Sequence, residues 1–214
     1  MSLTHPASAG FQGAQPTLAS VLWPRRDAQR LLRPAVLAVI GSLLVAASAQ
    51  VEVPLWPVPI TGQTFAVLVI GMAYGARLGA ATLALYLLQG LLGLPVFTGF
   101  ASGPAVLLGP TGGYLLGFVL AAGLIGYLAE RGWDRGALTT ALAMLLGNVV
   151  IYLPGLAWLT VFLASAKSLA FDAAFKLSLA SGLTPFLVGD VLKLALAAAA
   201  LPLAWKLLAK ARRG

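Results

Sequence analysis

Two ionisable side chains of opposite charge lie inside the last apolar stretch of the chain. Asp190 and Lys193 stand three positions apart within GLTPFLVGDVLKLALAAAALPL, so a helix would place both on one face. A charge at bilayer depth costs about 2.5–3.5 kcal/mol and usually marks a functional site. The two residues could form a structural ion pair. Alternatively, Asp190 could accept hydrogen bonds from the N–H groups of a ligand while Lys193 donates to its carbonyl or carboxylate.

Most other polar side chains of the apolar segments fall near one level of the expected bundle. A helix rises about 1.5 Å per residue, which places them in the half nearer the outer surface. Scattered helix–helix hydrogen bonds would show no such bias, so the pattern predicts an outward-facing ligand pocket. Its candidate residues are Gln63, Thr64, Tyr86, Gln89, Thr111, Tyr114, Asn148 and Tyr152. Packing alone remains an alternative for Tyr86, a helix end for Gln89, and helix–helix hydrogen bonding for Asn148.

The elements that must position these residues are membrane-spanning helices. The chain has 214 residues, of which 60% are hydrophobic and 9% charged, against about 25% charged in soluble domains. The apolar runs are continuous rather than alternating, which predicts an all-α integral membrane protein and excludes a β-barrel pattern. Six transmembrane helices are expected at about 33–50, 62–75, 77–93, 110–130, 137–164 and 182–208. Residues 165–181 are expected to form an amphipathic surface segment.

The positions of the basic residues predict the orientation. With both termini cytoplasmic, eleven of the 14 basic residues fall on the inner side, as the positive-inside rule requires. The formal net charge of +8 is therefore explained by topology, and no nucleic-acid partner is needed. Residues 1–30 lack the apolar core of a signal peptide and are expected to form a disordered or interfacial cytoplasmic tail. Residues 31–210 are expected to form the transmembrane domain.

Two uncharged loops are expected on the outer side, at 53–63 and 94–114. Both combine Pro and Gly with aromatic residues, namely Trp56, Phe97 and Phe100. Irregular backbone near a membrane is tolerated where it packs on protein or lines a cavity. The loops are therefore predicted to form a lid that covers an apolar ligand; ordinary Pro-stiffened connections are the alternative.

Several classes of function lack their chemical groups. There is no Cys, and the one His is His5 in the N-terminal tail, so a metal centre is not expected. Gly109-Pro110-Thr111-Gly112-Gly113-Tyr114 lacks the Lys-Ser/Thr ending of an ATP-binding loop. No Ser/His or Asp/His set lies in the spans, so the chain is predicted not to be an enzyme and to need no cofactor. It is expected to bind a small ligand and to depend on a partner for energy. A membrane enzyme and a purely structural subunit are the competing hypotheses.

The first span offers a surface for such a partner. Ala38, Ser42 and Ala46 recur every fourth position, and small residues let another helix approach closely. The alternative is that this stripe packs against the protein's own bundle.

Five motifs in order resemble the BioY family, the biotin-specific substrate-binding (S) components of energy-coupling-factor transporters in prokaryotes. The resemblance covers roughly residues 35–208. The motifs are VPLWPVPITGQT (53–64), GLPVF (93–97), GPTGGYLLGF (109–118), GNVVIY (147–152) and PFLVGDVLK (185–193).

The resemblance implies a six-helix fold in the cytoplasmic membrane with a high-affinity biotin pocket near the outer surface. It also implies a transmembrane coupling (T) subunit and two ABC-type ATPases as partners. Asp190 and Lys193 would meet the polar head of biotin, and the stripe of Ala38, Ser42 and Ala46 would face the T subunit. Another vitamin such as thiamin, or transport without the ATPases, remains open.

Overall fold

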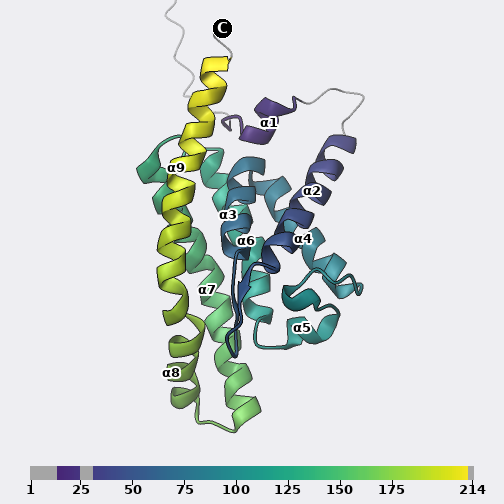
Figure 1. Cartoon of the computed structure of the whole chain (residues 1–214), viewed down its shortest axis with the longest axis vertical. Helices are drawn as coiled ribbons and strands as arrows, with labels where there is room; N and C mark the ends of the chain where they lie inside the picture. Colours follow the sequence, from purple (N-terminus) through teal and green to yellow (C-terminus); the bar gives the residue numbers. More distant parts are fainter. Residues whose placement is uncertain (1–13, 25–30, 212–214) are drawn as a thin grey trace, which may run out of the picture.

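The computed structural model describes residues 14–24 and 31–211. Six apolar helices build the bundle: α2 (Leu32–Ala49), α3 (Gln63–Tyr74), α4 (Ala76–Leu91), α6 (Gly112–Ala129), α7 (Ala137–Lys167) and α9 (Leu187–Ala211) (Figure 1). The shorter helices are α1 (Leu18–Leu22), α5 (Pro104–Leu108) and α8 (Phe171–Gly182), with 3-10 turns η2 (Thr98–Phe100) and η3 (Thr184–Phe186). The strands β1 (Glu52–Val53) and β2 (Ile60–Thr61) form a small antiparallel hairpin.

Helix α6 is the centre of the bundle and packs against α3, α4 and α7. Glycine lets α7 approach it closely, because a Cβ on Gly117 would lie 2.9 Å from the Ile151 Cα. Residues facing these neighbours are buried along the whole of α6, including Phe118, Ala121 and Ile125. Replacing Gly117 would therefore push α6 and α7 apart.

The structure confirms the prediction of an all-helical membrane protein with about six apolar helices. Among the described residues, four segments are long and apolar enough to cross a membrane: Leu32–Ala49, Gly112–Ala129, Ala137–Lys167 and the combined run Phe171–Ala211. Helices α3 and α4 have 12 and 16 residues, so this pair is short, as the sequence indicated. The α3–α4 break falls at Gly75, whose φ of 85° favours glycine.

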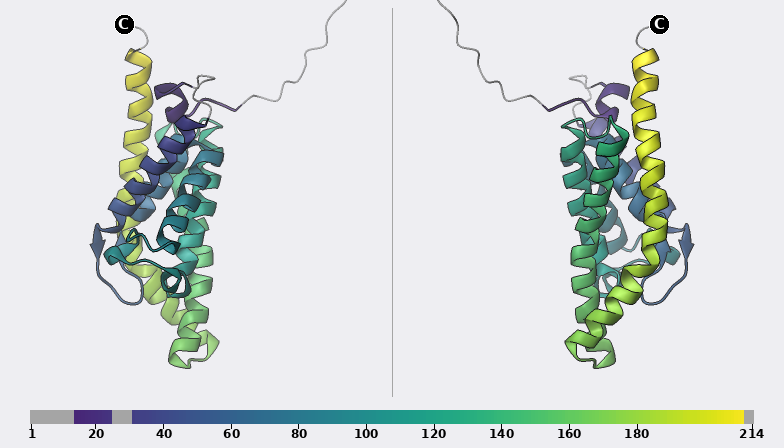
Figure 2. Two further views of the ribbon diagram at one scale, coloured as in Figure 1. Left: turned by 90° about the vertical axis from the view of Figure 1, so that its right-hand side faces the viewer. Right: turned by 90° about the vertical axis from the view of Figure 1, so that its left-hand side faces the viewer.

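The last part of the chain differs from the prediction. Residues 165–181 do not form a separate surface segment. Helix α7 continues to Lys167, and α8 folds back along it with Ala174 buried and the Thr160 and Ser178 hydroxyls 2.8 Å apart. The last helix begins at Leu187, not near residue 182, because Thr184–Phe186 form a 3-10 turn with Pro185 near its start. Figure 2 shows α8 and α9 following one another along the length of the molecule, with the hairpin projecting from its side.

The described part of the expected N-terminal tail packs on the bundle. The Gln15 amide donates to the Glu130 carbonyl at 2.7 Å, and Arg33 Nη2 donates to the Ala19 carbonyl at 2.7 Å. Leu18 and Ala19 are buried. Within this part Leu18–Leu22 form α1 against the bundle, while residues 1–13 and 25–30 lie outside the described residues.

A buried carboxylate fixes α9 to the link between α6 and α7. Asp134 is fully buried, and its Oδ2 accepts a hydrogen bond from Trp205 Nε1 at 2.5 Å. The Arg135 guanidinium carbon lies 4.6 Å from the centre of the Trp205 ring. Burial raises the pKa of Asp134 above its ordinary value of 3.8, although the hydrogen bond from Trp205 opposes this shift.

We predict that Trp205→Phe lowers the melting temperature by about 2–10 °C. The substitution removes the side-chain donor of a buried carboxylate, a loss of about 1–3 kcal/mol in the free energy of unfolding. The measurement is thermal unfolding of the purified protein in detergent. Trp158→Phe is the matched control, because Trp158 Nε1 donates to the neutral carbonyl of Gly109 at 2.8 Å. An equal effect of both variants would contradict a special role for the buried charge.

The Asp134 carboxyl also predicts a pH dependence. Its folded pKa is raised, so the folded state binds the proton more readily and this residue's contribution to stability falls as pH rises above about 4. Asp134→Asn should therefore stabilise the protein more at pH 7 than just above pH 4, as measured by melting temperature. A constant difference would show that Asp134 is not the titrating group.

Candidate functional site

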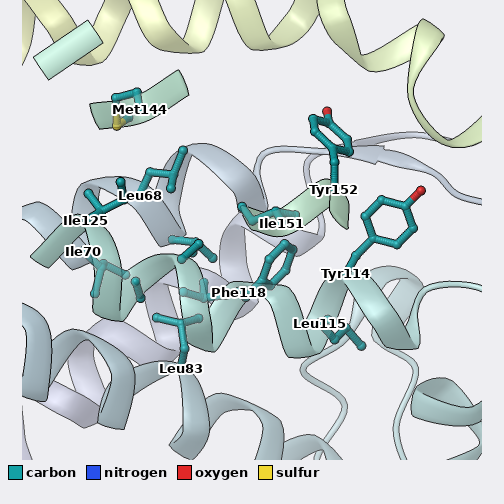
Figure 3. Close-up of a cluster of buried hydrophobic side chains, with 14 of the residues drawn as sticks. Leu68, Ile70, Leu83, Tyr114, Leu115, Phe118, Ile125, Met144, Ile151 and Tyr152 are labelled. Carbon is teal, nitrogen blue, oxygen red and sulfur yellow. The ribbon is translucent and has the colours of Figure 1, made fainter. Parts of the chain in front are cut away.

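A cavity of about 360 Å³ lies between the bundle and the two loops. It sits beyond one end of the buried apolar cluster of Leu68, Ile125 and Met144, where Figure 3 shows Tyr114 and Tyr152 with Phe118 beside them. Its volume is in the range of small-molecule sites. Its lining residues are Glu52, Pro54, Leu55, Val58, Pro59, Thr61, Gln63, Thr64, Tyr86, Phe97, Thr98, Val106, Thr111, Tyr114, Leu115, Phe118, Tyr152, Phe186 and Lys193.

Lys193 connects α9 to α3 and β2 across the cavity wall. Its Nζ donates to the Thr61 carbonyl at 2.9 Å and to Thr64 Oγ1 at 2.8 Å. The Asp190 Oδ1 lies 3.6 Å from the same nitrogen, and the Tyr152 hydroxyl donates to Asp190 Oδ2. The ion pair expected as one alternative therefore exists, and Lys193 also reaches the cavity. Asp190 is buried behind Lys193 and Tyr152 and does not line the cavity.

A second polar cluster joins α3 and α4 to the loop at 94–103. Gln63 Nε2 donates to the Tyr86 hydroxyl at 2.7 Å, and that hydroxyl donates to the Val96 carbonyl at 3.1 Å. Thr98 Oγ1 donates to Gln63 Oε1 at 3.3 Å. The cluster fixes the amide of Gln63 in the wall of the cavity, where it has both donor and acceptor chemistry.

Aromatic rings form the apolar wall between the two polar clusters. Tyr114 and Tyr152 meet edge to face at 6.3 Å between ring centres, and Tyr152 meets Phe186 at the same distance. The Tyr114 hydroxyl donates to the Gly182 carbonyl at 2.9 Å, so it ties α6 to the end of α8. This wall suits the apolar part of a ligand.

The two loops cover one side of the cavity. Pro54, Leu55 and Val58 of the β1–β2 hairpin line it, as do Phe97 and Thr98 of the second loop. Gln50 at the end of α2 holds the second loop in place. Its Nε2 donates to the Phe97 carbonyl at 3.0 Å, and its Oε1 accepts from the Phe100 amide at 3.2 Å.

The structure brings most of the expected site residues together. Those that line the cavity are Gln63, Thr64, Tyr86, Phe97, Thr111, Tyr114, Tyr152 and Lys193. Asp190 lies outside the lining and contacts two of these residues, Lys193 and Tyr152.

Four expected site residues do not line the cavity: Asp190, as described above, and Trp56, Asn148 and Gln89. Trp56 is 64% exposed on the outside of its loop, with Lys167 Nζ 4.3 Å from its ring centre. Asn148 and Gln89 each have a buried side-chain oxygen without a hydrogen-bond partner among the described residues. Asn148 lies one helical turn before Tyr152 on the same face of α7, so its depth along the helix keeps it out of the cavity. Phe100, expected in the lid, is 68% exposed.

Several residues line the cavity that the sequence pattern did not predict. Phe118 lies one turn after Tyr114 on the same face of α6, so the four-residue spacing could have identified it. Glu52 directly precedes the uncharged loop, and its charge gives no sign in the sequence that it reaches an otherwise apolar opening. Thr98 and Phe186 reach the cavity through 3-10 turns that have no simple sequence signal.

The small-residue stripe of α2 packs within the chain. Ser42 is fully buried and Ala38 is 9% exposed, while Ala46 is partly buried. A Cβ on the adjoining Gly41 would lie 2.7 Å from Thr82 of α4. The burial favours the alternative of internal packing: Ala38 and Ser42 meet the protein's own bundle, because small residues here admit α4 closely.

Within residues 14–24 and 31–211, no group of three or more His, Cys, Asp or Glu side chains could hold a metal ion.

The model of the BioY family matches residues 19–210, which is most of the chain. The chain belongs to the BioY family.

Curated BioY proteins are similar over most of their length. The probable biotin transporter BioY of Pyrococcus horikoshii is 40% identical over 154 residues, which cover 72% of this chain and 85% of that protein. The biotin transporter BioY of Thermotoga maritima is 36% identical over 168 residues, covering 78% and 92%. The crystal structure of the S-component for biotin from an ECF-type ABC transporter superposes with a TM-score of 0.69 at 22% identity, covering 85% of this chain and 95% of that one. That structure shows the S-component fold.

In this BioY-family chain, we predict that Lys193→Met lowers the free energy of unfolding by about 3–5 kcal/mol, because it leaves the buried Asp190 carboxylate without its cation. The double variant Lys193→Met/Asp190→Asn should recover part of this loss, since the unpaired charge is then gone. The measurement is a double-mutant cycle, in which melting temperatures are compared for the wild type, the two single variants and the double variant. Strictly additive losses would mean that the two side chains do not interact.

Proposed function

We propose that the chain binds biotin in this cavity and delivers it across the prokaryotic cytoplasmic membrane as the S component of an energy-coupling-factor transporter. The observation that carries the proposal is the arrangement of the cavity in a BioY-family chain. Two polar clusters, around Lys193 and around Gln63, flank an aromatic wall. Family membership over residues 19–210 supports the same conclusion.

The chemistry of biotin fits this arrangement. Its ureido ring has two N–H donors and one carbonyl, its thioether ring is apolar, and its tail ends in a carboxylate. In our proposal Lys193 Nζ donates to the ureido carbonyl, and the Asp190–Tyr152 pair supports the acceptor side of the same end. The thioether ring lies against the aromatic wall of Tyr114, Tyr152 and Phe186. The flexible tail then points towards the two loops.

The distribution of charge supports an orientation with both termini cytoplasmic. Described basic residues gather at the end of the bundle that carries α1, the α6–α7 link and the end of α9; they are Arg33, Arg77, Arg131, Arg135, Lys206 and Lys210. The opposite end, with the α7–α8 connection, has Lys167 and Lys176 together with Asp172. By the positive-inside rule, the crowded end is cytoplasmic and the cavity belongs to the outer half.

Energy for release would come from partners. The chain has no ATP-binding loop motif, so the proposal includes a T subunit and two ABC-type ATPases. Residues 31–210 form the substrate-binding domain in this proposal. The buried positions Ala38 and Ser42 are not available for the T-subunit contact in this conformation, so that contact must use exposed side chains.

The experiment that tests the proposal is binding of labelled biotin to the chain alone, purified in detergent. We expect saturable binding that unlabelled biotin displaces and thiamin does not. Displacement by thiamin alone would assign another vitamin. Absence of binding by well-folded protein would overturn the proposed ligand.

We further predict that Asp190→Asn weakens biotin binding by about 10- to 150-fold, because Asp190 holds Tyr152 and Lys193 in the cavity wall through charge-assisted contacts worth about 1.5–3 kcal/mol. Tyr86→Phe should weaken it less, since its hydroxyl already pairs with Gln63 and the Val96 carbonyl. The measurement is the dissociation constant of each variant. Equal affinities would remove Asp190 from the proposed site.

A further inference from the structure

We infer that Glu52 makes the mouth of the cavity select against an anionic ligand tail, so that the site accepts carboxyl-modified biotin amides at least as well as free biotin. The inference rests on the proposed function, because it concerns the same cavity and ligand. It adds a specificity-determining residue and a wider class of substrates, namely biotin joined to an amine through an amide bond.

The first observation is the charge balance of the cavity. Of the described lining residues, only Glu52 and Lys193 have formal charges at neutral pH. The Lys193 ammonium is opposed by Asp190 at 3.6 Å and donates to Thr61 and Thr64. The charge at that end is therefore balanced within the protein, and the unbalanced charge of the cavity is the carboxylate of Glu52.

The second observation is the position of Glu52. It lies on β1, paired with Thr61 of β2, and is exposed while also lining the cavity. Its Oε1 would lie 4.0 Å from a Cβ built on Gly99, so the carboxylate stands between the two loops. Within the described residues, no hydrogen bond or ion pair engages it. An unpaired carboxylate at this opening faces whatever part of the ligand lies nearest to the loops.

Nearby basic residues do not cancel this charge inside the cavity. Lys167 lies over the outer side of the Trp56 ring at 4.3 Å and does not line the cavity. Lys176 and Asp172 are on α8 and do not line it either. Exposed charges are screened over about 8–10 Å in physiological salt, so the contact between Glu52 and the ligand tail dominates.

Free biotin would place its carboxylate close to Glu52 when its ring occupies the Lys193 end. Two like charges 4 Å apart in water repel by an amount equivalent to about a fivefold change in affinity. An amide removes this repulsion, and an amide that ends in an ammonium group turns it into attraction. The preference should therefore follow the charge of the tail.

The test measures dissociation constants of three ligands for the wild-type chain and for Glu52→Gln. The ligands are biotin, biotinamide and biotin coupled to ethylenediamine, whose tails are anionic, neutral and cationic. We expect Glu52→Gln to bind biotin about three- to fivefold more tightly and the cationic amide about three- to fivefold more weakly, with biotinamide unchanged. High salt should reduce these differences. Asp172→Asn, an exposed acid outside the cavity, is the matched control and should leave all three constants unchanged.

The outcomes separate this inference from the proposed function. If the wild-type chain binds biotin but Glu52→Gln shifts all three ligands equally, or none, Glu52 does not sense the tail and the inference fails alone. If the charge preference responds to Lys193→Met and not to Glu52→Gln, the tail lies at the opposite end and the inference fails. If the folded wild-type chain binds none of the three ligands, the proposed function fails and the inference falls with it.

Discussion

The structure depends on one half-buried ammonium group, that of Lys193. A cation within an apolar bundle must be paired and hydrogen-bonded, and this one meets a carboxylate on its own helix, a hydroxyl on α3 and a backbone carbonyl of β2. Each partner comes from a different part of the fold. The requirement for pairing therefore brings α9, α3 and the hairpin to one point, and that point is a wall of the cavity.

The helices of the bundle pack closely except around the cavity. Around α6, glycine and alanine bring the neighbouring helices into contact over most of its length. Near its beginning α6 still meets α7 closely through Gly113 and Gly117, but it turns the aromatic side chains of Tyr114 and Phe118 to the cavity, which the loops cover. The bundle is consequently solid at the end with the basic residues and hollow near the hairpin. The separation of the two regions lets the Asp134–Trp205 contact fix α9 without reaching the ligand site.

Much of this could be predicted from residue types and spacing. Continuous apolar runs locate the helices, and the isolated charges Asp190 and Lys193 identify the site, because an ionisable group in such a run requires a partner or a ligand. The depth at which the cavity ends was harder to predict. Asn148 and Tyr152 share a face of α7 by spacing, yet only Tyr152, one turn further along, reaches the cavity. The small-residue stripe of α2 was ambiguous for a physical reason. Small side chains allow another helix to pack closely, whether that helix belongs to the same chain or to a partner. The turn at Thr184–Phe186 depends on packing between α8 and α9, which no local pattern expresses.

The two hydrogen bonds of Gln50 connect the first long helix to the covering loop. The carboxamide at the end of α2 is joined to Phe97 and Phe100, and Phe97 lines the cavity. If α2 tilts within the membrane, residues 97–100 must therefore move with it, or both hydrogen bonds must break. The Gln50 side chain thus couples the position of α2 to that of residues 97–100, which cover the cavity.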